Sequence, residues 1–460
     1  MRIRFVDLTF FQRAVLCLAI AGLPVCTLPA AAQGGGFTPD HTRGPKDVPL
    51  SNHFSDKPSQ PPAFAIPVEP LGYTAPGPLY LGQRNALASL DFLDENHLLF
   101  TFRVPGLIHR QLQSGETVEG DERQIRAVVL ALPLGNVQAE ALWTLYDRSQ
   151  YLWMLKNGHF LLRIADTVQQ GDATLDLKPL LRFPGPVLSM QMDPSQRFLV
   201  TNSHEPGKTP EKPGRVPTPA EAEAAMDSDA DQRPGQPEII VRILHRDSGQ
   251  VMLVSRVRAT VNLPINVDGY LEALRGRGLD WVLNLNYFTG GSTVLGHVDS
   301  TCAPQSEFIS QREILVTGCA PSGAHKLMAL ATNGRPLWQD LAAPEQIWPQ
   351  LIRSPDGSRL GWETLAVSRA VTAYAPLDRD AIKGQVVRIF DAATGKLALE
   401  APASPILDVG GNVAISPTGR RIAVLNAGSI QLYELPPAPP LPDSAAAPSS
   451  GTALAPAPAH

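Results

Sequence analysis

Short apolar runs separated by turn residues extend over most of this chain. Residues 98–104 alternate apolar and polar side chains, and 125–132, 239–244 and 251–257 are rich in Val, Ile and Leu. Runs of this length bounded by Gly, Pro, Asn or Asp are typical of β-strands. Helical periodicity is nearly absent between 81 and 435, so the pattern predicts an all-β fold.

Glycine-containing turns join neighbouring runs. Lys156-Asn-Gly158, Asp247-Ser-Gly249, Ala393-Thr-Gly395 and Asn426-Ala-Gly428 each separate two apolar segments. Glycine tolerates the positive φ that tight hairpin turns require. Each of these positions therefore predicts a β-hairpin.

One phrase, a turn followed at once by a strand, recurs three times. It reads Asp193-Pro-Ser-Gln-Arg-Phe-Leu-Val, Ser354-Pro-Asp-Gly-Ser-Arg-Leu and Ser416-Pro-Thr-Gly-Arg-Arg-Ile-Ala-Val. Pro presets φ in such turns, and Asp or Ser can bond the turn's own backbone. Repetition of one turn-and-strand unit indicates a repeat architecture and favours a β-propeller.

The expected strands set the size of the propeller. Roughly 24 to 28 strands at four per blade give six to eight blades, with about seven expected. Ring closure predicts that a strand before Leu81 or near Leu90 pairs with 430–435, because an unpaired edge there would invite aggregation. An array of β-sandwiches or two smaller β domains remain alternatives.

These turns and hairpins resemble the repeats of WD40-like and quinoprotein-like β-propeller proteins. The resemblance rests on the turns at Ser354 and Ser416 and on the hairpins ending at Gly249 and Gly395. The Gly-His and Trp-Asp signatures of WD40 repeats are missing, which makes the chain a divergent relative. The resemblance implies a single propeller resembling exported bacterial ones, and it carries over no catalytic residue, quinone site or haem site.

The two ends of the chain differ from its centre. Arg2, Arg4 and Arg13 precede a short apolar stretch, and Ala30-Ala-Ala32 after it offers the small residues of a cleavage site, which is the pattern of a signal peptide. We therefore expect export to the periplasm or the extracellular space and no membrane span after cleavage, with an uncleaved anchor as the alternative. The expected organisation is a signal peptide (1–32), a flexible linker (33–80), a propeller (81–435) with a disordered insertion loop (204–237), and a Pro/Ala-rich disordered tail (436–460).

Composition narrows the range of partners. Hydrophobic residues make up 43% of the 460 residues and charged residues 18%, which suffices for a large core. The formal net charge is −5, with no basic stripe, so a nucleic-acid binder is not expected. We expect a monomer.

Two cysteines remain after the signal peptide. Cys302 and Cys319 are an even pair in an oxidising compartment, so we expect a disulfide between them. Closing a loop of about 16 residues contributes roughly 3 kcal/mol in the chain-entropy model. Two buried free thiols are the alternative.

The insertion loop carries acidic residues with calcium-loop spacing. Asp227, Asp229 and Asp231 stand at positions 1, 3 and 5, and Glu238 at position 12, as in an EF-hand loop. However, Gln232 replaces the glycine of position six, and a strand follows where a helix should. An acidic solvated loop is the favoured interpretation, with calcium binding as the alternative. No other cofactor is expected.

Two stretches combine aromatic residues with arginine. They could form a stacking and hydrogen-bonding surface for sugar or peptide, or their aromatic rings could fill the space between blades. The candidate binding residues are Trp143, Tyr146, Arg148, Tyr151 and Trp153 in the first stretch, and Tyr270, Arg275, Trp281 and Tyr287 in the second.

No linear catalytic motif is present. The sequence lacks a GxSxG nucleophile elbow, a P-loop, a dinucleotide loop and an HExxH zinc motif. We therefore expect a non-catalytic exported propeller that binds a protein or a cell-envelope polymer. The alternative is a lyase or hydrolase acting on glycans or peptides, which predicts acids, His and Arg converging at the channel mouth.

Overall fold

The structure is a computed structural model of the whole chain. It describes residues 50–51, 59–77, 86–104, 123–145, 150–204, 239–257, 260–342, 346–368 and 379–440. The chain divides into two compact units, Met1–Gly44 and Pro45–His460, and all described residues belong to the second.

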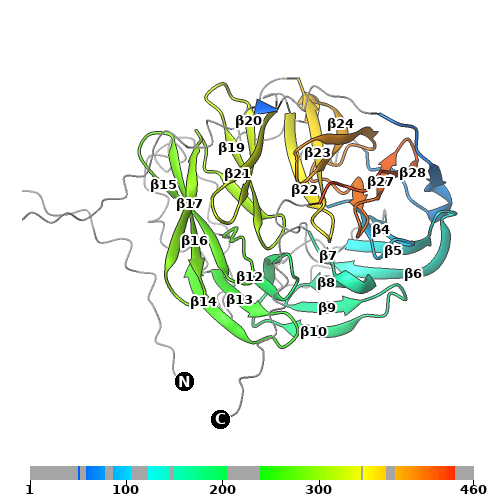
Figure 1. Cartoon of the computed structure of the whole chain (residues 1–460). Coiled ribbons are helices and arrows are strands. Elements are labelled where there is room, and N and C mark those ends of the chain that lie inside the picture. The colour runs from blue at the N-terminus through cyan, green and yellow to red at the C-terminus, as the bar shows by residue number, and fades with distance from the viewer. Residues whose placement is uncertain are drawn as a thin grey trace, which may run out of the picture. The chain divides into compact units, whose positions relative to one another are not determined.

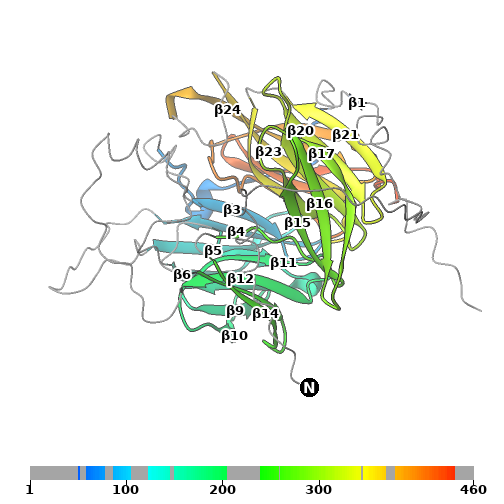
Figure 2. The ribbon, with the colours of Figure 1, turned by 90° about the vertical axis from the view of Figure 1, so that its left-hand side faces the viewer.

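The described residues form 28 strands in seven sheets and no α-helix. The sheets follow one another around a centre in chain order, as the colours of Figure 1 show. This is a seven-bladed β-propeller, which confirms the predicted fold. Figure 2 shows the neighbouring strands of single sheets from the side.

Blades 1 to 3 are four-stranded antiparallel sheets whose strands follow the chain from the centre outward. Blade 1 contains β3 (Ala88–Phe92), β4 (His97–Arg103), β5 (Arg123–Ala131) and β6 (Asn136–Leu145). Blade 2 contains β7 (Leu152–Met154), β8 (Phe160–Ile164), β9 (Thr167–Gly171) and β10 (Lys178–Arg182). Blade 3 contains β11 (Val187–Met192), β12 (Phe198–His204), β13 (Ile239–His245) and β14 (Val251–Val257).

Blades 5 to 7 keep the same order, and blades 5 and 7 each include one strand from the N-terminal part of the chain. Blade 5 contains β18 (Gln305–Phe308), β19 (Glu313–Cys319), β20 (His325–Ala331) and β21 (Pro336–Ala342), and β1 (Leu50–Ser51) adds in parallel to β21. Blade 6 contains β22 (Gln346–Arg353), β23 (Arg359–Val367), β24 (Ile382–Asp391) and β25 (Leu397–Ala403). Blade 7 contains β26 (Val413–Ile415), β27 (Arg421–Asn426), β28 (Ser429–Glu434) and β2 (Phe64–Pro67).

Blade 4 has three regular strands and an irregular inner segment. Its strands are β15 (Gly269–Arg275), β16 (Asp280–Tyr287) and β17 (Ser292–Asp299), which Figure 2 shows side by side. The position of an inner strand is taken by residues 260–265, which pair with β15 through one bridge, Ile265 to Tyr270. Pro264 lacks the N–H that a longer ladder needs, which accounts for the short pairing.

Ring closure uses a strand from before the first blade. β2 pairs antiparallel with β28, with Ile66 opposite Ile430, so the prediction of a closing strand before Leu81 is confirmed. β2 lies inside the segment 33–80, however, where we expected a linker without packed elements. Among its described residues this segment packs, because Ile66 is only 4% exposed.

Seven apolar clusters fill the spaces between neighbouring blades. Central strands are buried on both faces and therefore read as continuous apolar runs, such as Leu98 to Phe100, each 0% exposed. Trp338 and Trp362 lie in the cluster between blades 5 and 6. Burial of such side chains between blades contributes most of the stability of the ring.

The recurrent turn phrase joins the inner strand of a blade to the next strand. Ser354 is 1% exposed, and its hydroxyl accepts the backbone N–H of Arg359 at 2.9 Å. Ser416 does the same for Arg421 at 3.0 Å, and Asp193 accepts the N–H of Phe198 at 2.7 Å. The first residue of the phrase is therefore a buried internal cap that fixes the turn.

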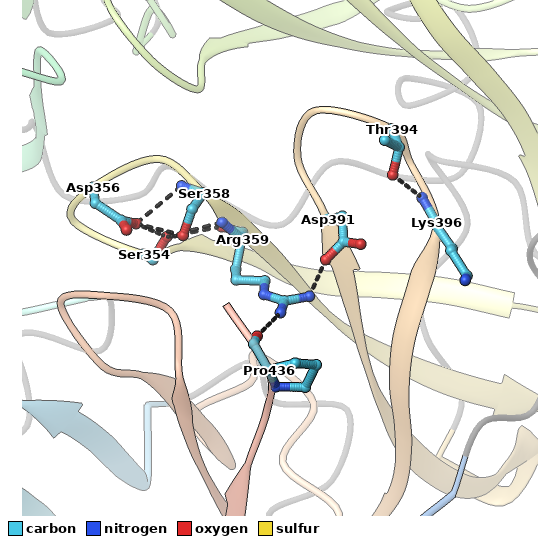
Figure 3. Close-up of polar contacts among 8 residues, drawn as sticks. All are labelled: Ser354, Asp356, Ser358, Arg359, Asp391, Thr394, Lys396 and Pro436. Atoms are coloured by element: carbon cyan, nitrogen blue, oxygen red, sulfur yellow. Dashed lines mark hydrogen bonds and ion pairs between the residues drawn. The ribbon is translucent and has the colours of Figure 1, made fainter. Parts of the chain in front are cut away.

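Arg359 at the start of β23 also binds the chain that follows the last strand of the propeller. Arg359, 1% exposed, pairs with Asp391 at the end of β24 and donates to the carbonyl of Pro436 at 2.6 Å (Figure 3). In the tail 436–460, the described residues 436–440 have no regular structure. One buried guanidinium thus links blade 6 to the chain that leaves blade 7.

Further predictions have different outcomes. The disulfide between Cys302 and Cys319 is present, as predicted. The predicted signal peptide, and the insertion loop 204–237 apart from His204 at the end of β12, lie outside the described residues. No helix in the described part of the chain is long and apolar enough to cross a membrane.

Candidate functional site: the central channel

The inner strands of the seven blades enclose a cavity of about 370 Å³. Every blade contributes to its wall, with blade 4 contributing through the irregular segment that contains Asn262, Pro264 and Ile265. A cavity of this size lies within the range of ordinary ligand sites. We call this cavity the central channel.

The two ends of the central channel differ in chemistry. Because each blade repeats the same antiparallel order, all inner strands run in one direction, and their first residues lie towards one end. Polar side chains line the starting end, whereas the end near the turns combines apolar side chains with the charged Arg353 and the amide of Gln196. The polar residues are Ser89, Gln150, Asn262 and Ser306, and the apolar ones Met154, Met192, Ile265, Phe308 and Ile415.

Asp91 is the acidic residue of blade 1 in the channel. It stands two residues after Ser89 on β3, so both side chains lie on the same face of the strand. The Ser89 hydroxyl donates a hydrogen bond to the Asp91 carboxylate. Burial raises the pKa of Asp91 to about 7, and this hydrogen bond offsets part of the effect. Asp91 therefore changes charge near neutral pH.

A second acid lies across the ring beside the channel's arginine. Glu307 of β18 faces Arg353 of β22, with 3.8 Å between the glutamate Oε1 and the arginine Nε. The Arg353 Nη1 donates to the carbonyls of Phe308 at 2.8 Å and Ile309 at 3.3 Å. Burial raises the pKa of Glu307, and the nearby Arg353 partly counteracts this. The pair links blades 5 and 6 at the channel wall.

Amide side chains complete the wall between blades 3 and 4. Gln191 of β11 donates to Asn262 and accepts the N–H of Leu263 at 3.1 Å. These bonds hold the irregular inner segment of blade 4 against blade 3. The amides keep further hydrogen-bonding capacity for a ligand, because an amide group has two donors and two lone pairs.

The first predicted aromatic group lies mainly between blades 1 and 2. Trp143 is 5% exposed and packs against Phe160, with 5.7 Å between ring centroids. Tyr151 is 3% exposed, and its hydroxyl is 2.8 Å from the Thr101 hydroxyl. Trp153 lines the central channel. Tyr146 and Arg148 lie outside the described residues.

The second predicted group lies in blade 4. The ring of Tyr270 is 6.4 Å from that of Phe288, between blades 3 and 4. Arg275 is exposed and its guanidinium lies 6.0 Å from the ring of Trp281, whose Nε1 donates to a backbone carbonyl at 3.1 Å. Tyr287 packs against the cluster between blades 4 and 5. Of the described residues in both predicted groups, Trp153 alone reaches the channel.

The predicted calcium ligands Asp227, Asp229, Asp231 and Glu238 lie outside the described residues. In the part of the chain that the structure describes, no group of three or more His, Cys, Asp or Glu could hold a metal ion.

Sequence reasoning missed the charged residues of the channel. These are Asp91, Glu307 and Arg353, which come from blades 1, 5 and 6. The available signal was local: Ser89-Leu-Asp91 places two polar side chains on one face of a strand that is otherwise apolar. For the enzyme alternative, the described lining contains two acids and one arginine but no histidine.

Comparisons with known proteins give no family. No family model and no curated protein matches the chain. Among solved structures, the uncomplexed acylaminoacyl peptidase of Pyrococcus horikoshii is 11% identical, covering 77% of this chain and 52% of that chain, with a TM-score of 0.44. The chain thus spans about half the length of that peptidase.

A second similar structure is a propeller domain alone. The β-propeller domain of the Trilobed protease from Pyrococcus furiosus is 10% identical, covering 76% of this chain and 94% of that chain, with a TM-score of 0.40. The propeller assignment for the present chain follows from its own strand pairing.

Proposed function

We propose that this protein is an exported, non-catalytic binding module that holds a segment of another protein in its central channel. The observation that carries the proposal is the convergence of all seven blades on one cavity with both apolar and hydrogen-bonding walls. Pockets that combine an apolar lining with a few placed polar groups are the usual form of binding sites. Export rests on the signal-peptide pattern of residues 1–32.

The composition of the wall supports a protein ligand. Met154, Met190 and Met192 line the channel together with Trp153. Methionine is flexible and polarisable, so such surfaces adapt to different side chains. Arg353 is held by the backbone carbonyls of Phe308 and Ile309 and lies 3.8 Å from Glu307, which suits a fixed wall that positions a ligand.

The test is a cross-linked pull-down from the envelope fraction of the native host with the mature chain 33–460. Ser306→Trp fills the channel from its polar end, and Val251→Trp adds the same bulk on the exposed edge of blade 3, where Val251 is 45% exposed. We expect capture of a protein by the wild type and the Val251 variant and its loss in the Ser306 variant. Equal capture by all three chains would contradict a channel site, and capture of a glycan would replace the protein ligand by an envelope polymer.

One observation favours a second candidate, an acid–base enzyme acting on glycans or peptides. Asp91 has a pKa raised to about 7, and the pKa of Glu307 in the same cavity is also raised. A carboxylic acid that titrates near the working pH is suited to general acid catalysis. Release of reducing ends or amines from envelope fragments, abolished in Asp91→Asn, would establish this candidate. Binding without turnover would support the binding module.

A further inference from the structure

Asp91 lines the channel, and among the described residues no ion pair joins its carboxylate to a cation. Among the described residues, the Ser89 hydroxyl is the one group that donates a hydrogen bond to this carboxylate. The neighbouring inner strand, β7 of blade 2, lines the channel with Leu152 and Met154, which also pack in the cluster between blades 1 and 2. A partly buried carboxylate in such surroundings is stabilised by a cation that can reach it.

Among the described residues near Asp91, the other charged groups do not form an ion pair with it. Tyr151 of blade 2 is neutral near pH 7, since burial raises its pKa above the usual value and the hydrogen bond with Thr101 offsets only part of this effect. Arg123 acts electrostatically on Tyr151, and burial still dominates the ionisation of Asp91. Arg353 across the channel faces Glu307. Strand β26 contributes Val413-Ala-Ile415, which has no ionisable side chain.

We propose that the central channel binds a primary alkylammonium group, with the ammonium on the Asp91 carboxylate and the methylene chain along Leu152 and Met154 of blade 2. This inference rests on the proposed function and names the chemistry that the channel selects. The same group is available from two sources, a lysine side chain of a partner protein and a free aliphatic diamine. An alkylammonium group fits this site because it brings one positive charge to the Asp91 carboxylate and methylene groups to the adjoining apolar wall.

Protonation of Asp91 then controls the affinity of the channel for the alkylammonium group. The ammonium is attracted by the ionised carboxylate, which predominates above its pKa of about 7. The ionised fraction falls about tenfold between pH 8 and pH 6, so the affinity for the cation should fall about tenfold as well. Ser89→Ala removes the hydrogen bond that stabilises the carboxylate and should move this pH profile upward.

The experiment is calorimetric titration of the chain 33–460 with pentylamine, 1,5-diaminopentane, N-acetyl-lysine methylamide and the neutral 1-pentanol. We expect the amines to bind at pH 8, about tenfold more weakly at pH 6, and 1-pentanol to bind at least tenfold more weakly than pentylamine. Asp91→Asn should lose amine binding and its pH dependence. Asp247→Asn, which removes the same charge from an exposed turn, should bind as the wild type does.

The outcomes separate the two proposals. Equal binding of pentylamine and 1-pentanol by the wild type would overturn the inference without any variant, even if Asp91→Asn failed to fold. If Asp91→Asn captures the envelope partner normally, the channel function stands and the ammonium does not come from a lysine of the partner; if the wild type also binds no amine, the alkylammonium assignment is wrong. If amines bind but Ser306→Trp still captures the partner, the proposed function is wrong and the amine site remains. Binding of the diamine without the lysine derivative would identify a free amine as the ligand.

Discussion

The closing strand β2 allows a matched test of how the ring is held together. Ile66 and Phe64 lie two residues apart on β2, yet Ile66 is 4% exposed and Phe64 is 42% exposed. Ile66 packs in the cluster between blades 7 and 1, and its side chain lies where a Cβ on Gly135 would stand. Ile66→Ala should therefore loosen the joint between the last and first blades.

The expected magnitude follows from burial. Truncation of a fully buried isoleucine to alanine costs about 2 to 5 kcal/mol, because apolar contact is lost and a cavity is left. Phe64→Ala removes a side chain that is largely in solvent, so we expect a loss of less than about 1 kcal/mol. Both variants keep the backbone pairing of β2 with β28.

The assay is urea unfolding followed by the fluorescence of the six tryptophans, with the midpoint compared at constant slope. The Ile66 variant should unfold at clearly lower urea than the Phe64 variant. Equal midpoints for the two variants would show that β2 does not close the ring in solution, and the reasoning would be refuted.

Three further predictions concern the same free energy of unfolding. Replacing Cys302 and Cys319 by serine should lower it by about 3 kcal/mol, and dithiothreitol should lower it for the wild type but leave the variant unchanged. Burial raises the pKa of Glu363 to about 7 from 4.5, so the folded state binds this proton more tightly than the unfolded state does. Stability should therefore fall as the pH rises from about 5 to 8, and Glu363→Gln should reduce that fall; an unchanged pH profile would contradict the assignment. Ser354→Ala should cost about 1 to 3 kcal/mol because a buried N–H loses its acceptor, whereas the exposed Ser322→Ala should change little, and equal effects would refute the capping role.

The blades could be predicted from sequence because their signals are local. The phrase at Asp193, Ser354 and Ser416 combines a turn preference with a following apolar strand, and both depend on residues within one hairpin. The structure shows that the first residue of the phrase caps its own turn, so the local signal has a local cause.

Ring closure and blade 4 were harder to predict in detail. β2 has only four residues, Phe64–Pro67, in a Pro-rich segment, and its partner β28 lies more than 350 residues away in sequence. The inner segment of blade 4 contains Pro264 and makes a single bridge, so it has little strand pattern of its own. Neighbouring blades hold both β2 and the inner segment of blade 4 in place. Tertiary packing of this kind produces only a weak local pattern in the sequence.

The charged residues of the central channel could not be predicted from the sequence for a related reason. Asp91, Glu307 and Arg353 stand on inner strands of blades 1, 5 and 6, and only the closed ring brings them around one cavity. The aromatic residues that the sequence offered as candidate binding residues, such as Trp143, mainly fill the space between blades. Large side chains are conspicuous in a sequence, whereas a channel is defined by position in the fold.

Site-specific photo-cross-linking tests the central claim most directly. A photoreactive residue replaces either Gln150, an exposed side chain at the polar end of the channel, or Val251 on the outer edge of blade 3. After irradiation in the envelope fraction, our account predicts one dominant protein adduct from position 150 and none from position 251. An adduct from position 251 alone would place the binding surface on the outside of the propeller and would contradict a ligand held in the central channel.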